Sequence, residues 1–234
     1  MVLPVRARGK GVMDWTAFLL STKLAAWTVV LLLPTSIFIA RHLAWRRYRG
    51  RVFVEAAMAL PLVLPPTVLG YYLLVGMGKA SPIGQAYETL FGAPLVFTFE
   101  GVLLASLIFN LPFAVQPIQR SFEAISGEVR DAAACCGMSP ARILWRIELP
   151  LAWPGIMTAF VLVFVHTIGE FGVVLMVGGS IPGETRTAAI EIYDRVQAFD
   201  NAAAGAMSAL LLVISLIAIV IANVATSKAD IGRE

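Results

Sequence analysis

Residues 128–154 read EVRDAAACCGMSPARILWRIELPLAWP, and the interpretation of the whole chain starts from this stretch. Residues 131–133 favour a helix, and Gly137 is a residue type that commonly ends one. Ser139 is then a good N-cap, and Pro140 takes the first helical position, which together form a strong start signal. The stretch therefore predicts two short helices with a sharp break between them.

Long uncharged runs lie on both sides of this stretch. Of the 234 residues, 59% are hydrophobic and 14% are charged, and the mean hydropathy is +0.81. A soluble domain is typically about 45–50% apolar and about 25% charged, whereas one membrane-spanning helix needs about 20 apolar residues. The composition therefore predicts an all-α polytopic membrane protein with about five transmembrane helices, six being the alternative. The runs cover residues 15–40, 56–78, 101–119, 149–183 and 201–227.

The run over residues 149–183 is too long for one straight span, because a helix of that length would extend about 52 Å. It is also too short for two spans and a turn. We therefore predict one span followed by a broken end at Gly169, Glu170, Phe171 and Gly172. Irregular backbone at membrane depth persists only beside protein or a water-filled path, so this break is a candidate gate or pathway wall.

Basic residues gather in three stretches that five spans would place on one face. Cytoplasmic loops carry an excess of Lys and Arg, so we expect the N terminus outside and the C terminus in the cytoplasm. Arg6, Arg8 and Lys10 oppose this orientation, unless the arginine-rich loop outweighs them or translation begins at Met13. A cleaved signal peptide fits less well, because Lys23 interrupts the apolar run. The three stretches hold Arg41, Arg46, Arg47, Arg49 and Arg51; Arg120, Arg130, Arg142 and Arg146; and Lys228 and Arg233.

The opening stretch resembles the EAA motif of ABC importer permeases, which is an acid, two alanines, three residues, glycine, nine residues, then Ile-x-Leu-Pro. Here Asp131-Ala132-Ala133 is followed by Gly137 and then by Ile147-Glu148-Leu149-Pro150, with matching spacing. The departure is aspartate for the usual glutamate at 131, which keeps the charge and shortens the reach by one methylene. The alternative is an amphipathic loop that packs only on its own subunit.

The resemblance implies that residues 121–150 form a coupling loop that docks in a groove of an ATPase subunit. It further implies three partners besides the lipid bilayer: a dimer of ABC ATPase subunits, a periplasmic oxyanion-binding protein, and a second copy of this chain that completes the path by symmetry. The residues assigned to ATPase coupling are Asp131, Ala132, Ala133, Gly137, Met138, Ser139, Pro140, Ile147, Leu149 and Pro150.

Three further stretches are similar to molybdate permeases, with which the chain aligns in order from about Trp15 to Thr226. They are LPLVLPPTVLGY at residues 60–71, GEFG at 169–172 and SIPGETRT at 180–187. The resemblance implies a permease of the bacterial inner membrane that translocates molybdate by ATP-driven alternating access. Tungstate or sulfate permeases share parts of the pattern and are the alternative, and an ion-coupled secondary transporter is a more distant one.

Glu170 is an ionisable residue within an apolar run, where such groups usually face the protein interior or a cavity. A carboxylate would repel an oxyanion, so we expect a structural or gating role, either through a basic partner or by accepting backbone N–H groups. His166 is a candidate partner, although a satisfied core histidine is the simpler interpretation and the one we favour. Pro61, Pro65 and Pro66 remove backbone donors and bend the second span, as part of a gate or as a packing kink.

Glu184, Thr185 and Arg186 follow the fourth run on the expected outer side. The resemblance implies that such loops meet the binding protein, and a solvated turn is the alternative. We expect a single transmembrane permease domain over residues 15–227, preceded by an extension over 1–14 and followed by a cytoplasmic tail over 228–234.

Catalytic and metal-binding patterns are not found in the sequence. Cys135 and Cys136 are adjacent, and there is no CxxC or Cys/His cluster, so we expect no metal and no cofactor. Without a P-loop the chain needs a separate subunit to hydrolyse ATP. His42 and His166 lack the setting of a protease site, and no internal repeat suggests a secondary transporter. We therefore expect a transporter subunit, not an enzyme, with no nucleic-acid partner.

Overall fold

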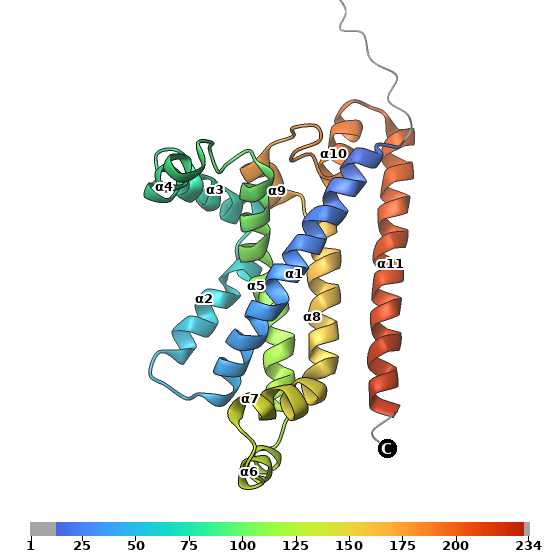
Figure 1. Ribbon diagram of the computed structural model, residues 1–234. Coiled ribbons are helices and arrows are strands. Elements are labelled where there is room, and N and C mark those ends of the chain that lie inside the picture. Colours follow the sequence, from blue (N-terminus) through green and yellow to red (C-terminus); the bar gives the residue numbers. More distant parts are fainter. Residues whose placement is uncertain (1–12, 232–234) are drawn as a thin grey trace, which may run out of the picture.

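The computed structural model describes residues 13–231, and every element in that range is helical (Figure 1). This architecture confirms the predicted fold class. In chain order the elements are α1 (Trp15–Trp45), α2 (Arg51–Val63), α3 (Pro66–Met77), α4 (Pro82–Phe91), α5 (Phe99–Glu123), α6 (Gly127–Cys135), α7 (Pro140–Ile143), the π-helical turn η1 (Leu144–Glu148), α8 (Leu149–Gly169), α9 (Gly172–Gly178), α10 (Ala188–Gln197) and α11 (Asn201–Ile231).

Four segments are long and apolar enough to cross a membrane: α1, α5, the continuous stretch Pro140–Gly169 and the first part of α11. The run predicted as the second span is a bent pair, because the chain direction changes by 113° between α2 and α3. Pro65 and Pro66 lie at the bend, and a proline keeps the residue before it out of the helical conformation. Counting the bent pair as one span gives five spans, as expected from the sequence.

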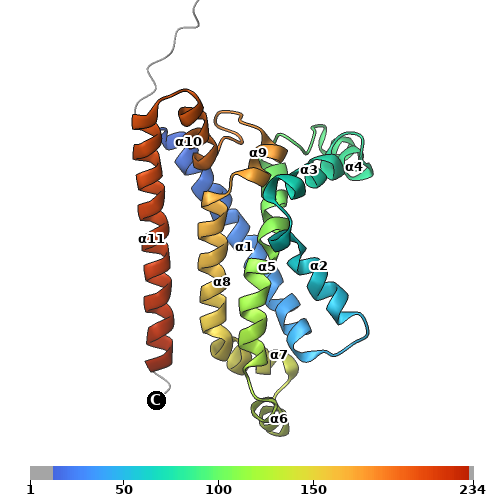
Figure 2. The same cartoon turned by 180° about the vertical axis from the view of Figure 1, so that it is seen from behind.

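Helices α1, α5 and α8 form the centre of the bundle (Figures 1 and 2). Small side chains occupy their crossings, since Ala40, Ala114 and Ala152 are fully buried. At Gly155 an added Cβ would lie 2.5 Å from the carbonyl oxygen of Pro117 on α5. Because the hydrophobic effect does not drive helix association in lipid, such close backbone approach is what holds membrane helices together.

Helix α11 stands at the edge of the bundle (Figure 2). It buries Ala203, Ala204 and Met207 near its start, against α8 and α10. Further along, Leu212 is 65% exposed and Leu216 is 56% exposed. A helix this apolar on its outer surface is suited to contact with lipid.

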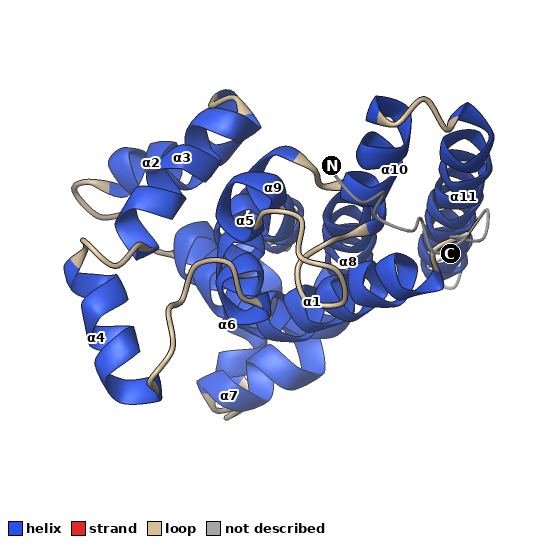
Figure 3. Ribbon diagram, turned by 90° about the horizontal axis from the view of Figure 1, so that it is seen from above, coloured by secondary structure: helices blue, strands red, loops and turns tan. Residues whose placement is uncertain are grey.

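The bundle has two different ends (Figure 1). The loop between α1 and α2, helices α6 and α7, and the last turn of α11 lie at one end, which we call the basic end. Helices α3, α4, α9 and α10 lie at the other, which we call the far end, and α4 and α11 occupy opposite edges in Figure 3. The three basic stretches thus share an end, as their charge pattern predicts; Arg6, Arg8, Lys10 and Arg233 lie outside the described residues.

Between α7 and α8 the chain makes one π-helical turn, η1. Such a turn inserts one extra residue into a helix and is frequent at functional sites. Trp145 on this turn is 68% exposed, whereas Glu148 at its end is fully buried. The chain thus stays helical from Pro140 to Gly169 while Glu148 points into the protein.

Candidate coupling loop and gate

The break between α6 and α7 has the geometry that the sequence predicts. Gly137 has φ +77°, and its N–H donates to the carbonyl oxygen of Ala134 at 2.9 Å while that of Met138 donates to Ala133 at 3.2 Å. This pair of bonds is a Schellman motif, which needs a left-handed residue and so favours glycine. The Ser139 hydroxyl then accepts from the N–H of Arg142 at 3.4 Å and caps α7.

The predicted coupling residues divide into two groups. Asp131, Ala132, Gly137, Ser139 and Pro140 are exposed at the tip of the basic end, where Figure 1 shows α6 projecting beyond the bundle. The rest pack against the bundle or lead into the membrane: Ala133 is buried, Met138, Ile147 and Leu149 are half-buried, and Pro150 is exposed in the first turn of α8. Only the first group presents a surface that a partner could bind.

Glu148 anchors the coupling loop to α1. Its carboxylate accepts from Nε of Arg41 at 2.5 Å, from Nη2 of Arg41 at 3.3 Å and from Nε of Arg130 at 2.8 Å. The guanidinium of Arg130 also lies over the ring of Trp45, 4.0 Å from its centroid. Sequence reasoning used Glu148 only as a spacer in the motif, and the one signal that could have singled it out is its acidic charge beside the apolar start of α8.

The two breaks proposed as a gate lie against each other. Helix α3 packs on α9, and a Cβ added to Gly172 would lie 2.8 Å from Cβ of Pro66. A Cβ on Gly70 would lie 2.8 Å from Cβ of Met176 in the same interface. The glycines therefore permit a close approach that any side chain would prevent.

The remaining residues of the proposed gate have separate positions. Pro61 lies inside α2 and is its one buried residue, and Pro65 is the N-cap of α3. Gly169 ends α8 with open space around it. Phe171 packs on Tyr193 of α10, with ring centroids 4.9 Å apart. The structure thus brings Pro66 and Gly172 together and spreads the others around that contact.

Glu170 is only 7% exposed, and it stabilises the break through the backbone. Its Oε1 accepts from the N–H of Val173 at 2.9 Å, in the first turn of α9. Within residues 13–231 no ion pair joins Glu170 to a basic residue, so of the two expected roles the backbone one is found. His166 instead bonds Asn110 on α5, with 3.0 Å between Nδ1 and Oδ1, and so is a satisfied core histidine.

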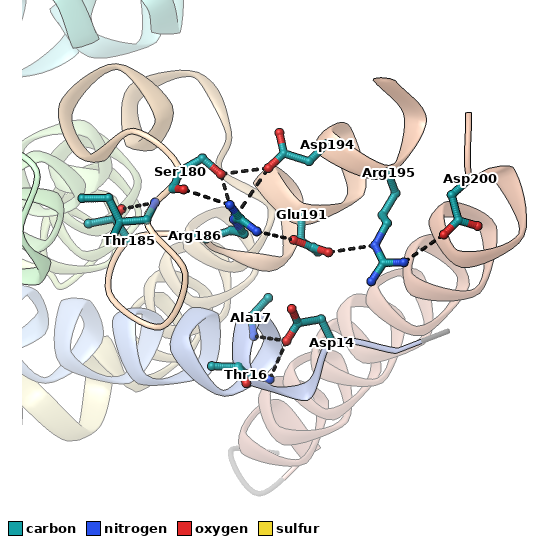
Figure 4. A network of polar contacts seen from close by, with 11 residues as sticks. Asp14, Thr16, Ala17, Ser180, Thr185, Arg186, Glu191, Asp194, Arg195 and Asp200 are labelled. Atoms are coloured by element: carbon teal, nitrogen blue, oxygen red, sulfur yellow. Dashed lines mark hydrogen bonds and ion pairs between the residues drawn. The ribbon is translucent and has the colours of Figure 1, made fainter. Parts of the chain in front are cut away.

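The loop at residues 179–187 is held from inside by two of its three proposed docking residues (Figure 4). Thr185 is buried, and its hydroxyl donates to the carbonyl oxygen of Gly178 at 2.7 Å. Arg186 donates to Oγ and to the carbonyl oxygen of Ser180, at 2.8 and 3.0 Å. Glu184 alone of the three is exposed, so the expectation that all three face a partner is corrected for the buried Thr185.

A chain of ion pairs continues from this loop to the start of α11 (Figure 4). Arg186 lies 3.3 Å from buried Glu191, which is 2.8 Å from Arg195, which in turn is 2.8 Å from Asp200. The hydrogen bond from Arg195 holds the pKa of Asp200 below its ordinary value. Sequence reasoning did not single out Glu191, Arg195 or Asp200 and missed the network, because its pairs depend on how α10 packs against the neighbouring segments.

Four apolar spans and the bent α2–α3 pair, with a capped two-helix loop projecting from the basic end, form the architecture expected of the membrane-spanning permease subunit of an ABC importer. The comparison with protein families agrees with this class. The profile described as "Binding-protein-dependent transport system inner membrane component" matches residues 32–228, and the chain belongs to this family.

Curated relatives show which transport proteins the chain is similar to within this family. The molybdenum transport system permease protein ModB of Azotobacter vinelandii is 49% identical over 191 residues, which are 82% of this chain and 84% of that protein. ModB of Escherichia coli (strain K12) is 37% identical over 184 residues, 79% of this chain and 80% of that protein. These relatives are permeases, so the chain is a multi-pass inner-membrane transport component and not an enzyme.

Among solved structures, a bacterial ABC transporter involved in the import of the acidic polysaccharide alginate matches with a TM-score of 0.75. The match covers 92% of this chain and 79% of that chain, at 14% sequence identity. At that identity the likeness shows a shared fold and nothing about the solute.

Proposed function

We propose that this chain is the permease of a molybdate importer and moves the anion by ATP-driven alternating access. The observation that carries the proposal is the 49% identity to a molybdenum transport permease over 82% of the chain. Two copies form the path between them, because one copy with five spans is too small to enclose it. A periplasmic binding protein delivers the anion, in line with the binding-protein-dependent family to which the chain belongs.

ATP binding in a separate pair of ATPase subunits acts on the path through the coupling loop. The exposed tip from Asp131 to Pro140 docks in the ATPase, and Asp131 has no ion-pair partner among the described residues. Glu148 transmits the movement of the tip, because it joins α6 to α1 through Arg130 and Arg41. This assignment places the basic end in the cytoplasm, with the C terminus inside and the N terminus outside.

The gate lies where α3 packs on α9. Both helices start directly after a break, and α9 packs on α5 as well as on α3, so a movement of the α3–α9 contact is transmitted to the central bundle. Contacts at Gly172 and Gly70 hold the two helices together in the state described here. Glu170 caps α9, and Glu184 on the neighbouring exposed loop meets the binding protein.

ATPase activity of the reconstituted complex tests this proposal. The complex contains the permease, its ATPase subunit and its binding protein, and the arms receive molybdate, tungstate, sulfate or no anion. The variant Gly137→Trp tests the coupling loop, and Gly92→Trp is the matched control, since Gly92 at the far end has a similar φ of +72° and open space around it.

We expect stimulation by molybdate that is lost in Gly137→Trp and kept in Gly92→Trp. Preferential stimulation by tungstate or sulfate would correct the solute and leave the importer class intact. No stable association with an ATPase subunit would overturn the proposed mechanism and favour ion-coupled transport.

A further inference from the structure

A hollow of about 490 Å³ at the basic end is lined mainly by basic residues. Arg41, His42 and Arg46 contribute from α1 and its C-cap, Arg130 from α6, and Trp45 closes one side. No carboxylate is among the residues that line it. The hollow therefore presents three guanidinium groups to whatever enters it.

The positive charge of this hollow is only partly neutralised. Glu148 lies behind it and pairs with both Arg41 and Arg130, so one carboxylate serves two guanidinium groups. Each guanidinium has five N–H donors, and the hydrogen bonds to Glu148 use Nε and Nη2 of Arg41 and Nε of Arg130. Arg46 is exposed and forms no ion pair within the described part of the chain. An anion can therefore bind here without displacing Glu148.

An apolar groove of about 530 Å³ continues from the hollow between α1 and α8. Phe38 lines both spaces and is 61% exposed. Trp145 and Trp153, at 68% and 48% exposed, stand on the other side of the groove. Both of its walls belong to segments that are long and apolar enough to cross a membrane, so the groove is suited to contact with lipid acyl chains beside the basic hollow.

We propose that the hollow and the groove together bind one anionic phospholipid. The phosphate lies against Arg41, Arg46 and Arg130, and one acyl chain fills the groove along Phe38 and Trp153. A free inorganic anion would leave the groove empty, and a zwitterionic lipid would leave the surplus charge uncompensated. Basic pockets between transmembrane helices at the cytoplasmic side suit acidic lipid headgroups. The bound lipid would hold α6 on α1 through Arg130, and so set the position of the coupling loop.

Native mass spectrometry of the full-length chain in mild detergent tests this site. The protein is incubated with equal amounts of dioleoyl phosphatidylglycerol and dioleoyl phosphatidylcholine, and the ratio of bound lipids is measured. The test variant is Arg46→Gln. Arg49→Gln is the matched control, because Arg49 is an exposed arginine of the same loop that does not line the hollow.

We expect phosphatidylglycerol to be preferred, and the preference to fall about fivefold in Arg46→Gln and to stay unchanged in Arg49→Gln. Both side chains are exposed, so we expect neither substitution to change the melting temperature. Measuring the melting temperature of each variant therefore checks that it is folded. An equal loss in the two variants would mean diffuse attraction and would overturn the proposal.

Two competitors separate the lipid from a small anion. Inorganic phosphate and dihexanoyl phosphatidylglycerol are added to the complex with long-chain phosphatidylglycerol, each at the concentration of that lipid. The bound lipid is isotope-labelled dioleoyl phosphatidylglycerol, and the unlabelled form of the same lipid serves as the reference competitor. Because neither inorganic phosphate nor the short-chain lipid fills the groove, we expect each to displace less of the bound lipid than this reference does. Equal displacement by inorganic phosphate would show a small-anion site and refute the lipid assignment. Neither readout depends on which anion is transported.

Discussion

Glu148 on η1 and Arg130 on α6 form an ion pair at 2.8 Å in which the carboxylate is fully buried. The variant Glu148→Gln removes this charge and leaves Arg41 and Arg130 without their anionic partner. Because breaking a buried pair leaves uncompensated charge, we expect a loss of about 3 kcal/mol in stability and a lower melting temperature. Thermal unfolding in detergent measures this loss of stability. The control is Glu128→Gln, because Glu128 on α6 is exposed. Equal melting temperatures for the two variants would contradict the anchoring role.

The left-handed conformation of Gly137 predicts a selective effect of alanine. Gly137→Ala forces a side chain to φ +77°, which costs about 1–2 kcal/mol per residue. We expect weaker coupling, measured as less transport per ATP hydrolysed in proteoliposomes. Gly127→Ala is the control, because Gly127 has equally open surroundings and no positive φ. The assignment fails if both variants lower the ratio alike.

The contact between Gly172 and Pro66 predicts a position-specific effect at the gate. Gly172→Ala places a Cβ 2.8 Å from that of Pro66 and pushes α9 from α3, at a cost of about 1–3 kcal/mol. We expect a several-fold lower transport rate. Gly169→Ala, three residues away, meets open space and should transport normally. Uptake of the radioactive anion into vesicles decides between them, and full activity of Gly172→Ala would argue against a gate at this contact.

The backbone role of Glu170 predicts that its charge is dispensable. Glu170→Gln keeps an oxygen that can accept the N–H of Val173, whereas Glu170→Ala does not. We expect Gln to keep most of the transport rate and Ala to lose about 1 kcal/mol of stability at the start of α9. Transport and thermal unfolding are measured for both. A strong loss with Gln would point to a role of the charge itself.

The pair of Arg195 and Asp200 predicts a dependence on acidic pH. Because the folded pKa of Asp200 is lowered, its contribution to stability is present above the ordinary aspartate pKa and is lost as the pH falls through the lowered value. We expect the stability difference between the unmodified chain and Asp200→Asn to shrink over that interval. Melting temperatures across a pH series measure this difference. For the control Glu184→Gln, at an exposed residue, we expect the difference from the unmodified chain not to shrink as the pH falls.

Local features of the fold could be predicted from the sequence, whereas contacts between distant segments could not. The break at Gly137 and the start at Ser139 depend on cap residues within one turn, so their geometry is as predicted. Pro65 and Pro66 predicted a bend, but not its 113°, which is stabilised by packing of α3 on α9. The pairing of Glu148 with Arg41 needs the packing of α1 beside the coupling loop, for which no spacing rule exists.

The π-helical turn at residues 144–148 determines the direction in which Glu148 points at the junction between the coupling loop and α8. Deleting the exposed Trp145 would restore regular α-helical hydrogen bonds within this turn and redirect the side chains of residues 144–148. Glu148 would then no longer be aimed at Arg130, although both residues would still be present. Homologous chains should therefore tolerate insertions or deletions at the exposed start of the loop that follows α4 more readily than single-residue length changes inside this turn.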